Sequence, residues 1–375
     1  MSAIRTITSS IGRTRNIPYA FGAMHAVVDA STVSVVVSAS FLHALSLGQA
    51  FTLILAYDLI AFGAQTFLGA LVDRLARPRT TVLVGLVATA ACVAVLPYAP
   101  TTAMILAGAG NALFHVGAGS LTLCMSGGRA APPGIFVGPG ALGLAFGTWL
   151  GKQGVYVPWP FYAALALCFA ATLAFREPTE YGVVVDARSP TAASTSSPSP
   201  TIRFGLAVVA LLLFSIVVRS LVGFAGCHDC PRGPTTLVAL GLAAFSGKAL
   251  GGVVSDRLGW AEVSVGALLL SAPLIAFGGA NVAMVAAGMF LFQMTMPVTL
   301  SAVALVMPKR PGLAFGLTCL ALVTGSLPTF TRVAVPLYRP EVFLALIALS
   351  ALAIWVGLRA LGTARPVRGL LRRTA

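Results

Sequence analysis

The sequence contains few charged residues, and acidic residues are the scarcest of them. Charged side chains make up 9% of the 375 residues, and only 10 residues are Asp or Glu. A soluble globular chain carries about 25% charged residues. Because this composition cannot provide a water-exposed surface, the sequence excludes a soluble globular protein and predicts an integral membrane protein.

Motifs typical of several enzyme classes are also absent. The sequence has no G-x-x-x-x-G-K-S/T nucleotide-binding loop, no H-E-x-x-H or other paired metal-ligand motif, and no serine in a recognisable nucleophile elbow. These absences argue against a nucleotide-driven machine and against a membrane-embedded enzyme. We therefore predict no enzymatic activity, no cofactor and no metal site.

The first sixteen residues, MSAIRTITSSIGRTRN, lack the short apolar core of a secretory signal peptide. They are polar and basic instead. We expect no cleaved leader, so the first apolar run is predicted to stay in the membrane as a helix.

Long apolar runs dominate the rest of the chain. Hydrophobic residues make up 58% of the sequence, and the mean hydropathy is +0.93. Runs of about twenty apolar residues span a bilayer as helices. The twelve predicted spans are 17–41, 46–71, 80–98, 101–124, 132–152, 156–175, 203–224, 235–255, 260–279, 281–306, 311–334 and 340–361.

A polar stretch, DARSPTAASTSSPSP at 186–200, divides these runs into two groups of six. Its Ser, Pro, Thr and Ala residues have nothing to bury, so it is predicted to be a disordered linker. The predicted fold class is an all-α polytopic membrane protein. Its parts are an N-terminal segment at 1–16, a six-helix bundle at 17–175, a linker at 176–202, a second six-helix bundle at 203–361 and a basic tail at 362–375.

Basic residues gather on one side of the predicted helices. The net charge is +14, and 18 Lys or Arg residues lie on the side shared by the two termini. The other side has four, namely Lys152, Arg232, Arg332 and Arg339. Since positively charged loops stay in the cytoplasm, both termini and the linker are predicted to be cytoplasmic, with the protein in the cell membrane. The same pattern argues against nucleic-acid binding.

The two groups of helices share sequence motifs. GALVDRLARPR (69–79) follows the second run and GVVSDRLGW (252–260) follows the eighth, while PPGIFVGPGALG (132–143) opens the fifth and RPGLAFGLTCL (310–320) opens the eleventh. Because these motifs recur about 180 residues apart, we predict a duplicated six-helix unit. Such duplication places a cavity between the halves at the midplane of the membrane, as in alternating-access carriers.

The repeated turn resembles the signature loop of the major facilitator superfamily. The first copy matches at Gly69, Leu71, Asp73, Arg74, Arg77 and Arg79, and the second at Gly252, Asp256, Arg257 and Gly259. Ala76 stands where the family usually has Gly. The resemblance implies two pseudo-symmetric six-helix bundles and a gate in which the acidic residues and arginines latch helix ends across the cytoplasmic face. The alternative is a solvated anchoring turn.

Further segments, at 24–30, 57–65, 110–129 and 296–300, are similar to the fosmidomycin-resistance group of efflux carriers. Val116 and Gly117 stand where that group tends to have Pro and Glu, so its drug substrate is not carried over. GIFVGPGALG resembles the Gly-Pro motif that proton-linked antiporters have in helix five, and small-residue packing explains the same segment equally well. Its members here are Gly134, Gly138, Pro139 and Gly143.

Ionisable residues lie within the apolar runs, where charge is costly and marks an ion or substrate path. His25 and Asp29 are four residues apart on one helix face, which suits either a proton relay or a structural hydrogen bond. His115 has Asn111 one turn earlier as a structural alternative. The predicted proton-coupling residues are His25, Asp29, Asp58 and His115.

Arg219 and Lys248 have no acidic residue within their own runs. They are predicted to bind an anionic substrate, with Asn111 and Gln65 as further substrate contacts. Ion pairs between the halves are the alternative, and Arg219 has the further possibility of extending to the outer surface.

The sequence CHDC at 227–230 lies between the seventh and eighth runs. Three alternatives are open for it: a disulfide, a metal site that also uses His228 and Asp229, or a reduced loop.

The predicted function is secondary active transport by alternating access. The expected partners are a small-molecule substrate, protons and the lipid bilayer, and the chain is expected to act as a monomer. Proton-coupled export of an anionic or amphipathic compound is favoured. An uncoupled facilitator, an uptake carrier, and a sensor or assembly protein that retains the carrier fold are the alternatives.

Overall fold

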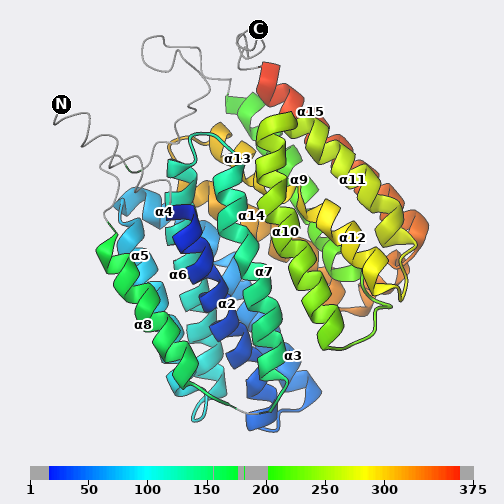
Figure 1. The fold of residues 1–375 in the computed structure, drawn as a ribbon. Helices are drawn as coiled ribbons and strands as arrows, with labels where there is room; N and C mark the ends of the chain where they lie inside the picture. The colour runs from blue at the N-terminus through cyan, green and yellow to red at the C-terminus, as the bar shows by residue number, and fades with distance from the viewer. Residues whose placement is uncertain (1–16, 155, 176–180, 182–201, 364–375) are drawn as a thin grey trace, which may run out of the picture.

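The computed structural model describes residues 17–154, 156–175, 181 and 202–363, and all the regular structure in these residues is helical. Helices α2 to α8 form one bundle and α9 to α15 form a second bundle beside it (Figure 1). Ten helices are long and apolar enough to cross a bilayer, and Trp159–Ala174 and Trp260–Ala276 are shorter apolar helices. The predicted fold class is confirmed. The predicted segment at 1–16, nearly all of the linker and the tail from 364 lie outside the described residues.

The N-terminal half contains a break in its second predicted span. A π-helical segment interrupts this span directly after Asp58, and π-helical turns inside α-helices often mark functional sites. The elements are α2 (Ile17–Leu42), α3 (Leu47–Asp58), η1 (Leu59–Gly63), α4 (Gln65–Leu75), α5 (Pro78–Val95), α6 (Pro100–Met125), α7 (Ala131–Gly151) and α8 (Trp159–Ala174).

The C-terminal half also has a break, in the tenth of the twelve predicted spans. The helix is interrupted at Met294 and Thr295, next to Pro297, which has no backbone N–H to continue the helical ladder. The helices are α9 (Ile202–Ala225), α10 (Pro234–Leu258), α11 (Trp260–Ala276), α12 (Val282–Gln293), α13 (Met296–Val306), α14 (Pro311–Ser326) and α15 (Pro340–Thr363). Two 3-10 segments, η2 (Leu327–Phe330) and η3 (Arg332–Leu337), follow α14.

Glycines on α7 let this helix approach both halves closely. A Cβ added at Gly134 would lie 2.5 Å from the carbonyl oxygen of Lys248 on α10, and one at Gly143 would lie 2.2 Å from the carbonyl oxygen of Ala26 on α2. Pro139 lies inside the helix between them. The Gly-Pro segment therefore places α7 between its own bundle and the other one.

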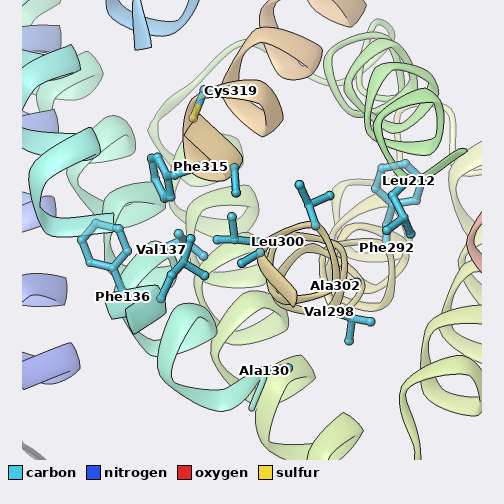
Figure 2. Close-up of a cluster of buried hydrophobic side chains, with 14 of the residues drawn as sticks. Ala130, Phe136, Val137, Leu212, Phe292, Val298, Leu300, Ala302, Phe315 and Cys319 are labelled. Carbon is cyan, nitrogen blue, oxygen red and sulfur yellow. The ribbon is translucent and has the colours of Figure 1, made fainter. Parts of the chain in front are cut away.

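Aromatic and aliphatic side chains fill the space between the halves near the centre. Figure 2 shows Phe136 of α7 facing Phe315 of α14, with Leu300 of α13 nearby, and the two ring centroids are 6.1 Å apart. All three side chains are buried. Phe136 also lies 5.0 Å from the ring of His25, so this apolar contact borders the polar centre of the N-terminal half.

Candidate functional site

The structure brings three of the predicted residues together inside the N-terminal bundle. His25 and Asp29 lie on α2 and His115 on α6, and the Nε2 atoms of the two histidines are 2.7 Å apart. The carboxylate of Asp29 lies 3.1 Å from His25 Nε2 and 3.6 Å from His115 Nε2. Each histidine is only 5% exposed. We call these three residues the His–Asp cluster.

The other ring nitrogen of each histidine faces a backbone carbonyl. His25 Nδ1 lies 3.0 Å from Phe136 O, and His115 Nδ1 lies 2.8 Å from Asn111 O. A carbonyl oxygen only accepts, so each Nδ1 carries a hydrogen and each neutral ring presents a lone pair at Nε2. Two lone pairs and a carboxylate therefore converge, and this arrangement needs a proton or another cation between them.

Polar neighbours hold the carboxylate of the cluster in place. Asn111 donates a hydrogen bond of 2.9 Å to Asp29. Thr32 lies 3.5 Å from the same amide nitrogen and 3.2 Å from the hydroxyl of Tyr57. Among the described residues, Asn111 Oδ1 is buried and has no hydrogen-bond partner. Asn111, predicted as a substrate contact, is thus part of the surroundings of Asp29.

Space for the cluster depends on a missing side chain. A Cβ added at Gly140 of α7 would lie 2.2 Å from His25 Nε2. Since no real contact is this short, any side chain at this position would displace the imidazole. Gly140 belongs to the Gly-Pro segment but was not among the residues predicted to act in it.

Two other predicted residues of the second span lie apart from the cluster. Asp58 ends α3 just before the π-helical segment and makes no hydrogen bond or ion pair with any residue that the structure describes. Gln65 is fully buried and donates to Ala61 O at 2.6 Å, while its Oε1 has no partner there. A Cβ added at Gly316 of α14 would lie 2.2 Å from Gln65 O, so Gln65 lies where the two halves touch.

Arg219 lies inside the C-terminal bundle and is 6% exposed, so its guanidinium does not extend to the surface. It donates hydrogen bonds to the hydroxyls of Thr295, at the break between α12 and α13, and of Thr299 at 3.5 Å. A cavity of about 10 Å³ beside it is also lined by Thr318, which leaves room for about one water molecule. No carboxylate within the described part of the chain forms an ion pair with Arg219.

Lys248 lies on α10 and faces the centre from the other side. Its charge interacts with those of Asp29 and Arg219 and with that of His115. No ion pair within 4.0 Å forms between Lys248 and an acidic residue in the described ranges. Ion pairs between the halves, which were the alternative role for Arg219 and Lys248, are therefore not observed among the described residues.

The first repeated turn contacts the opposite half through its carboxylate. Asp73 accepts hydrogen bonds of 2.8 Å from the backbone nitrogens of Gly312 and Leu313, at the N-terminus of α14. A carboxylate is favourable there because the first N–H groups of a helix are unpaired and the dipole is positive. A Cβ at Gly69 would lie 2.1 Å from Gly312 O, so the close contact requires glycine.

The second turn makes the same contact in the opposite direction. Asp256 of α10 accepts hydrogen bonds of 2.9 Å from the backbone nitrogens of Ala130 and Ala131, at the N-terminus of α7. A Cβ at Gly252 would lie 2.5 Å from Ala130 O. The two turns thus join the halves reciprocally at one end of the molecule, which we call the turn face.

Three of the turn arginines form no ion pair within the described residues, whereas Arg79 donates hydrogen bonds to Thr172 O and Leu173 O of its own bundle. Arg74, Arg77 and Arg257 are exposed, and none forms an ion pair with the residues described by the structure. The resemblance to the superfamily implied that acidic residues and arginines act together in the latch. In this conformation the carboxylates of Asp73 and Asp256 bridge the halves through backbone nitrogens.

Each turn carboxylate has an additional side-chain donor that the sequence did not reveal. The Tyr181 hydroxyl donates to Asp73 at 3.1 Å, and the Trp260 indole nitrogen donates to Asp256 at 3.0 Å. Burial raises the pKa of Tyr181, so its hydroxyl stays protonated and able to donate. Thr295 likewise has no motif of its own in the sequence, whereas Thr299 falls in the segment at 296–300 that is similar to the efflux carriers.

Cys227 and Cys230 are joined by a disulfide beyond the end of α9. His228, between them, stacks on Tyr338 with ring centroids 4.6 Å apart. Of the three alternatives for this loop the structure has the disulfide, and neither sulfur remains as a thiolate to bind a metal.

Comparisons with known proteins rest on structure, because no protein-family model and no curated protein matches the sequence. A variant of the E. coli fucose:proton symporter FucP matches with a TM-score of 0.64 and 12% identity, over 92% of this chain and 98% of its own. The human organic anion transporter MFSD10 matches with a TM-score of 0.63 and 17% identity, over 92% and 99%. An outward-facing bacterial homologue of the iron transporter ferroportin matches with a TM-score of 0.56 and 12% identity, over 93% of this chain and 99% of its own.

These matches cover 92–93% of this chain, which includes both bundles, and FucP is described as a major facilitator superfamily transporter. The identities are too low to carry over a substrate, but the shared architecture covers nearly every described helix. The chain is a multi-pass membrane protein with the fold of the major facilitator superfamily, as its repeated turns predicted.

Proposed function

We propose that this protein is a secondary transporter that moves a small organic anion across the membrane by alternating access, exporting it in exchange for protons. The observation that carries the proposal is the pair of cations, Arg219 and Lys248, that face the centre without an acidic partner within 4.0 Å among the described residues. Charges in a membrane-spanning helix are expensive and are retained for function. An anionic substrate would balance both.

Alternating access requires contacts that can open and close. The carboxylates of Asp73 and Asp256 cap helix N-termini of the opposite halves, so each contact consists of two backbone hydrogen bonds. Such charge-assisted bonds are directional and stronger than neutral ones. Opening the turn face therefore requires these four hydrogen bonds to be released.

The name of one structural neighbour is consistent with the proposed substrate class. MFSD10 is an organic anion transporter, so this fold accommodates such substrates. The surroundings of Arg219 also suit carboxylate binding, because Thr295 and Thr299 hold its guanidinium in a fixed orientation. A guanidinium held in this way can bind a carboxylate through two parallel hydrogen bonds.

We assign proton coupling to Asp58. It is a carboxylate in an apolar span without a hydrogen bond or ion pair among the described residues, and such a group is costly to keep charged. Asp58 interacts electrostatically with the phenol of the preceding residue, Tyr57. The adjoining π-helical segment supplies a place where the helix can rearrange. FucP, a proton symporter, has the same fold.

The test is anion transport by purified protein in liposomes, with a panel of mono- and dicarboxylates. Lys248→Gln and Arg219→Gln are each expected to reduce carboxylate transport by about 10- to 100-fold, since a lost charge-assisted contact costs about 1.5–3 kcal/mol and the remaining cation is left to bind alone. Lys152→Gln removes an exposed loop cation and is the matched control. Carboxylate transport that survives both central substitutions would overturn the proposal.

A further inference from the structure

We propose that the His–Asp cluster is a binding site for one divalent transition metal ion, held by Nε2 of His25, Nε2 of His115 and the carboxylate of Asp29. Two imidazoles and one carboxylate form a donor set that suits Zn²⁺, Fe²⁺, Co²⁺ and similar ions. The three groups come from two helices and meet only in the folded chain. The sequence predicted no metal site because it contains no paired ligand motif.

The distances between the donor atoms fit a metal ion. Zinc–nitrogen bonds of about 2.0–2.1 Å in a tetrahedral site place ligand atoms about 3.3 Å apart. In the cluster the three donor-to-donor distances are 2.7, 3.1 and 3.6 Å. Small shifts of the side chains would therefore admit an ion at the point where the two lone pairs and the carboxylate converge.

The surroundings of the cluster are those of a metal site. Histidines that bind metals usually donate their other N–H to a backbone carbonyl or a carboxylate, which fixes the tautomer. Both histidines do so here, to Phe136 O and Asn111 O. Asn111 also donates to Asp29 and keeps a buried Oδ1 without a partner in the described ranges. A water molecule bound to the metal would be a donor for that oxygen.

The charges around the cluster predict how its affinity can be changed. Lys248 of α10 and, beyond it, Arg219 of α9 are positive, and Tyr57 of α3 is a neutral phenol. Removal of the positive charge of Lys248 would reduce repulsion of a bound cation. Lys248→Gln should therefore strengthen metal binding, although the proposed function predicts that the same substitution weakens anion transport.

The experiment measures metal binding by the full-length protein in detergent, after treatment with a chelator. Zn²⁺ and Co²⁺ are added as chlorides, with calorimetry for affinity and Co²⁺ visible absorption for ligand geometry. We expect one ion per chain, and we expect His25→Gln and His115→Gln to weaken binding by more than about 100-fold, since even outer-shell changes cost 10–100-fold. Lys248→Gln should bind several-fold more tightly.

His43→Gln is the matched control, because His43 also contacts a backbone carbonyl, Leu96 O at 2.7 Å, but lies outside the cluster. It should bind like the wild type. If His115→Gln does not fold, His115→Cys keeps a ligand and should show a cobalt–thiolate absorption band. Failure of the wild type to bind either ion, or equal affinity in His115→Gln, would overturn the proposal and leave a shared proton in the cluster. Because no gradient or substrate is present, this outcome is independent of the transport proposal.

Discussion

In the N-terminal half, the carboxylate of Asp29 lies against two histidines, whereas the centre of the C-terminal half contains Arg219 and Lys248 without an acidic partner within 4.0 Å in the described ranges. At the turn face the same halves are nearly equivalent, since Asp73 and Asp256 make matching contacts. The contacts that join the two bundles at the turn face are therefore repeated, whereas the groups that we propose to bind ligands are not.

The largest difference between the two halves is expected when the cations of the C-terminal half are removed. Arg219→Gln and Lys248→Gln should each reduce carboxylate transport in liposomes by about 10- to 100-fold, while the metal affinity of the N-terminal half is retained or increased. Parallel loss of both properties would mean that the centres do not act separately.

The next largest effect is expected at Gly140, which gives the cluster its space. Gly140→Ala should lower the free energy of unfolding by about 1–3 kcal/mol, because overpacking of a filled interior costs that much, and should weaken metal binding as well. Gly266→Ala is the control, since a Cβ there meets nothing within 4 Å, and alanine should be neutral or slightly stabilising in that helix. Thermal unfolding of both variants, with and without Zn²⁺, measures the difference.

Substitutions in the two turns are expected to have smaller effects, and these effects should be equal for the two turns. Asp73→Asn and Asp256→Asn each weaken one helix cap, so each should destabilise the closed turn face by about 1–2 kcal/mol. The measurement is the rate at which thiol reagents modify a cysteine introduced near Gly312 or Ala131. Effects that differ by more than tenfold between the turns would contradict their functional equivalence.

Asp58 tests whether coupling belongs to the N-terminal half. Asp58→Asn should leave carboxylate binding intact and remove the response of transport to a pH gradient, because the neutral amide cannot exchange a proton. Asp229→Asn, in an exposed loop, should keep that response. If the transport rate of the wild type does not depend on the pH gradient, the protein is an uncoupled facilitator.

The smallest effect is expected from the additional donors of the turns. Tyr181→Phe removes one hydrogen bond to Asp73, worth about 1 kcal/mol, and Trp260→Phe removes the corresponding bond to Asp256. Both should raise thiol labelling at the turn face only slightly. A loss as large as that of Asp73→Asn would mean that Tyr181, and not the helix cap, holds the first turn.

Much of the fold could be predicted from the sequence because bilayer thickness and the repeated turns restrict it strongly. The interruptions of two predicted spans, at Leu59–Gly63 and at Met294 and Thr295, could not, because apolar runs do not show local helix geometry. The pairing of His25 with Asp29 followed from their spacing. The approach of His115 did not, since it depends on how α2 and α6 pack.

The polar partners of the functional groups were the least predictable part. Thr295 binds Arg219 across 76 residues, and Tyr181 reaches Asp73 across 108. Neither has a motif of its own, and each acquires a role only from tertiary packing. The exposed arginines Arg74, Arg77 and Arg257 show the opposite case, in which a motif is present but its side chains form no ion pair within the described residues.

The most direct test of anion binding at Lys248 is a ligand-stabilisation screen of the purified wild type and Lys248→Gln, with compounds grouped by charge. We predict that carboxylates raise the Tm of the wild type, that neutral and cationic compounds do not, and that the carboxylate effect disappears in Lys248→Gln. Stabilisation of both proteins to the same extent, or a preference for neutral compounds, would contradict this prediction.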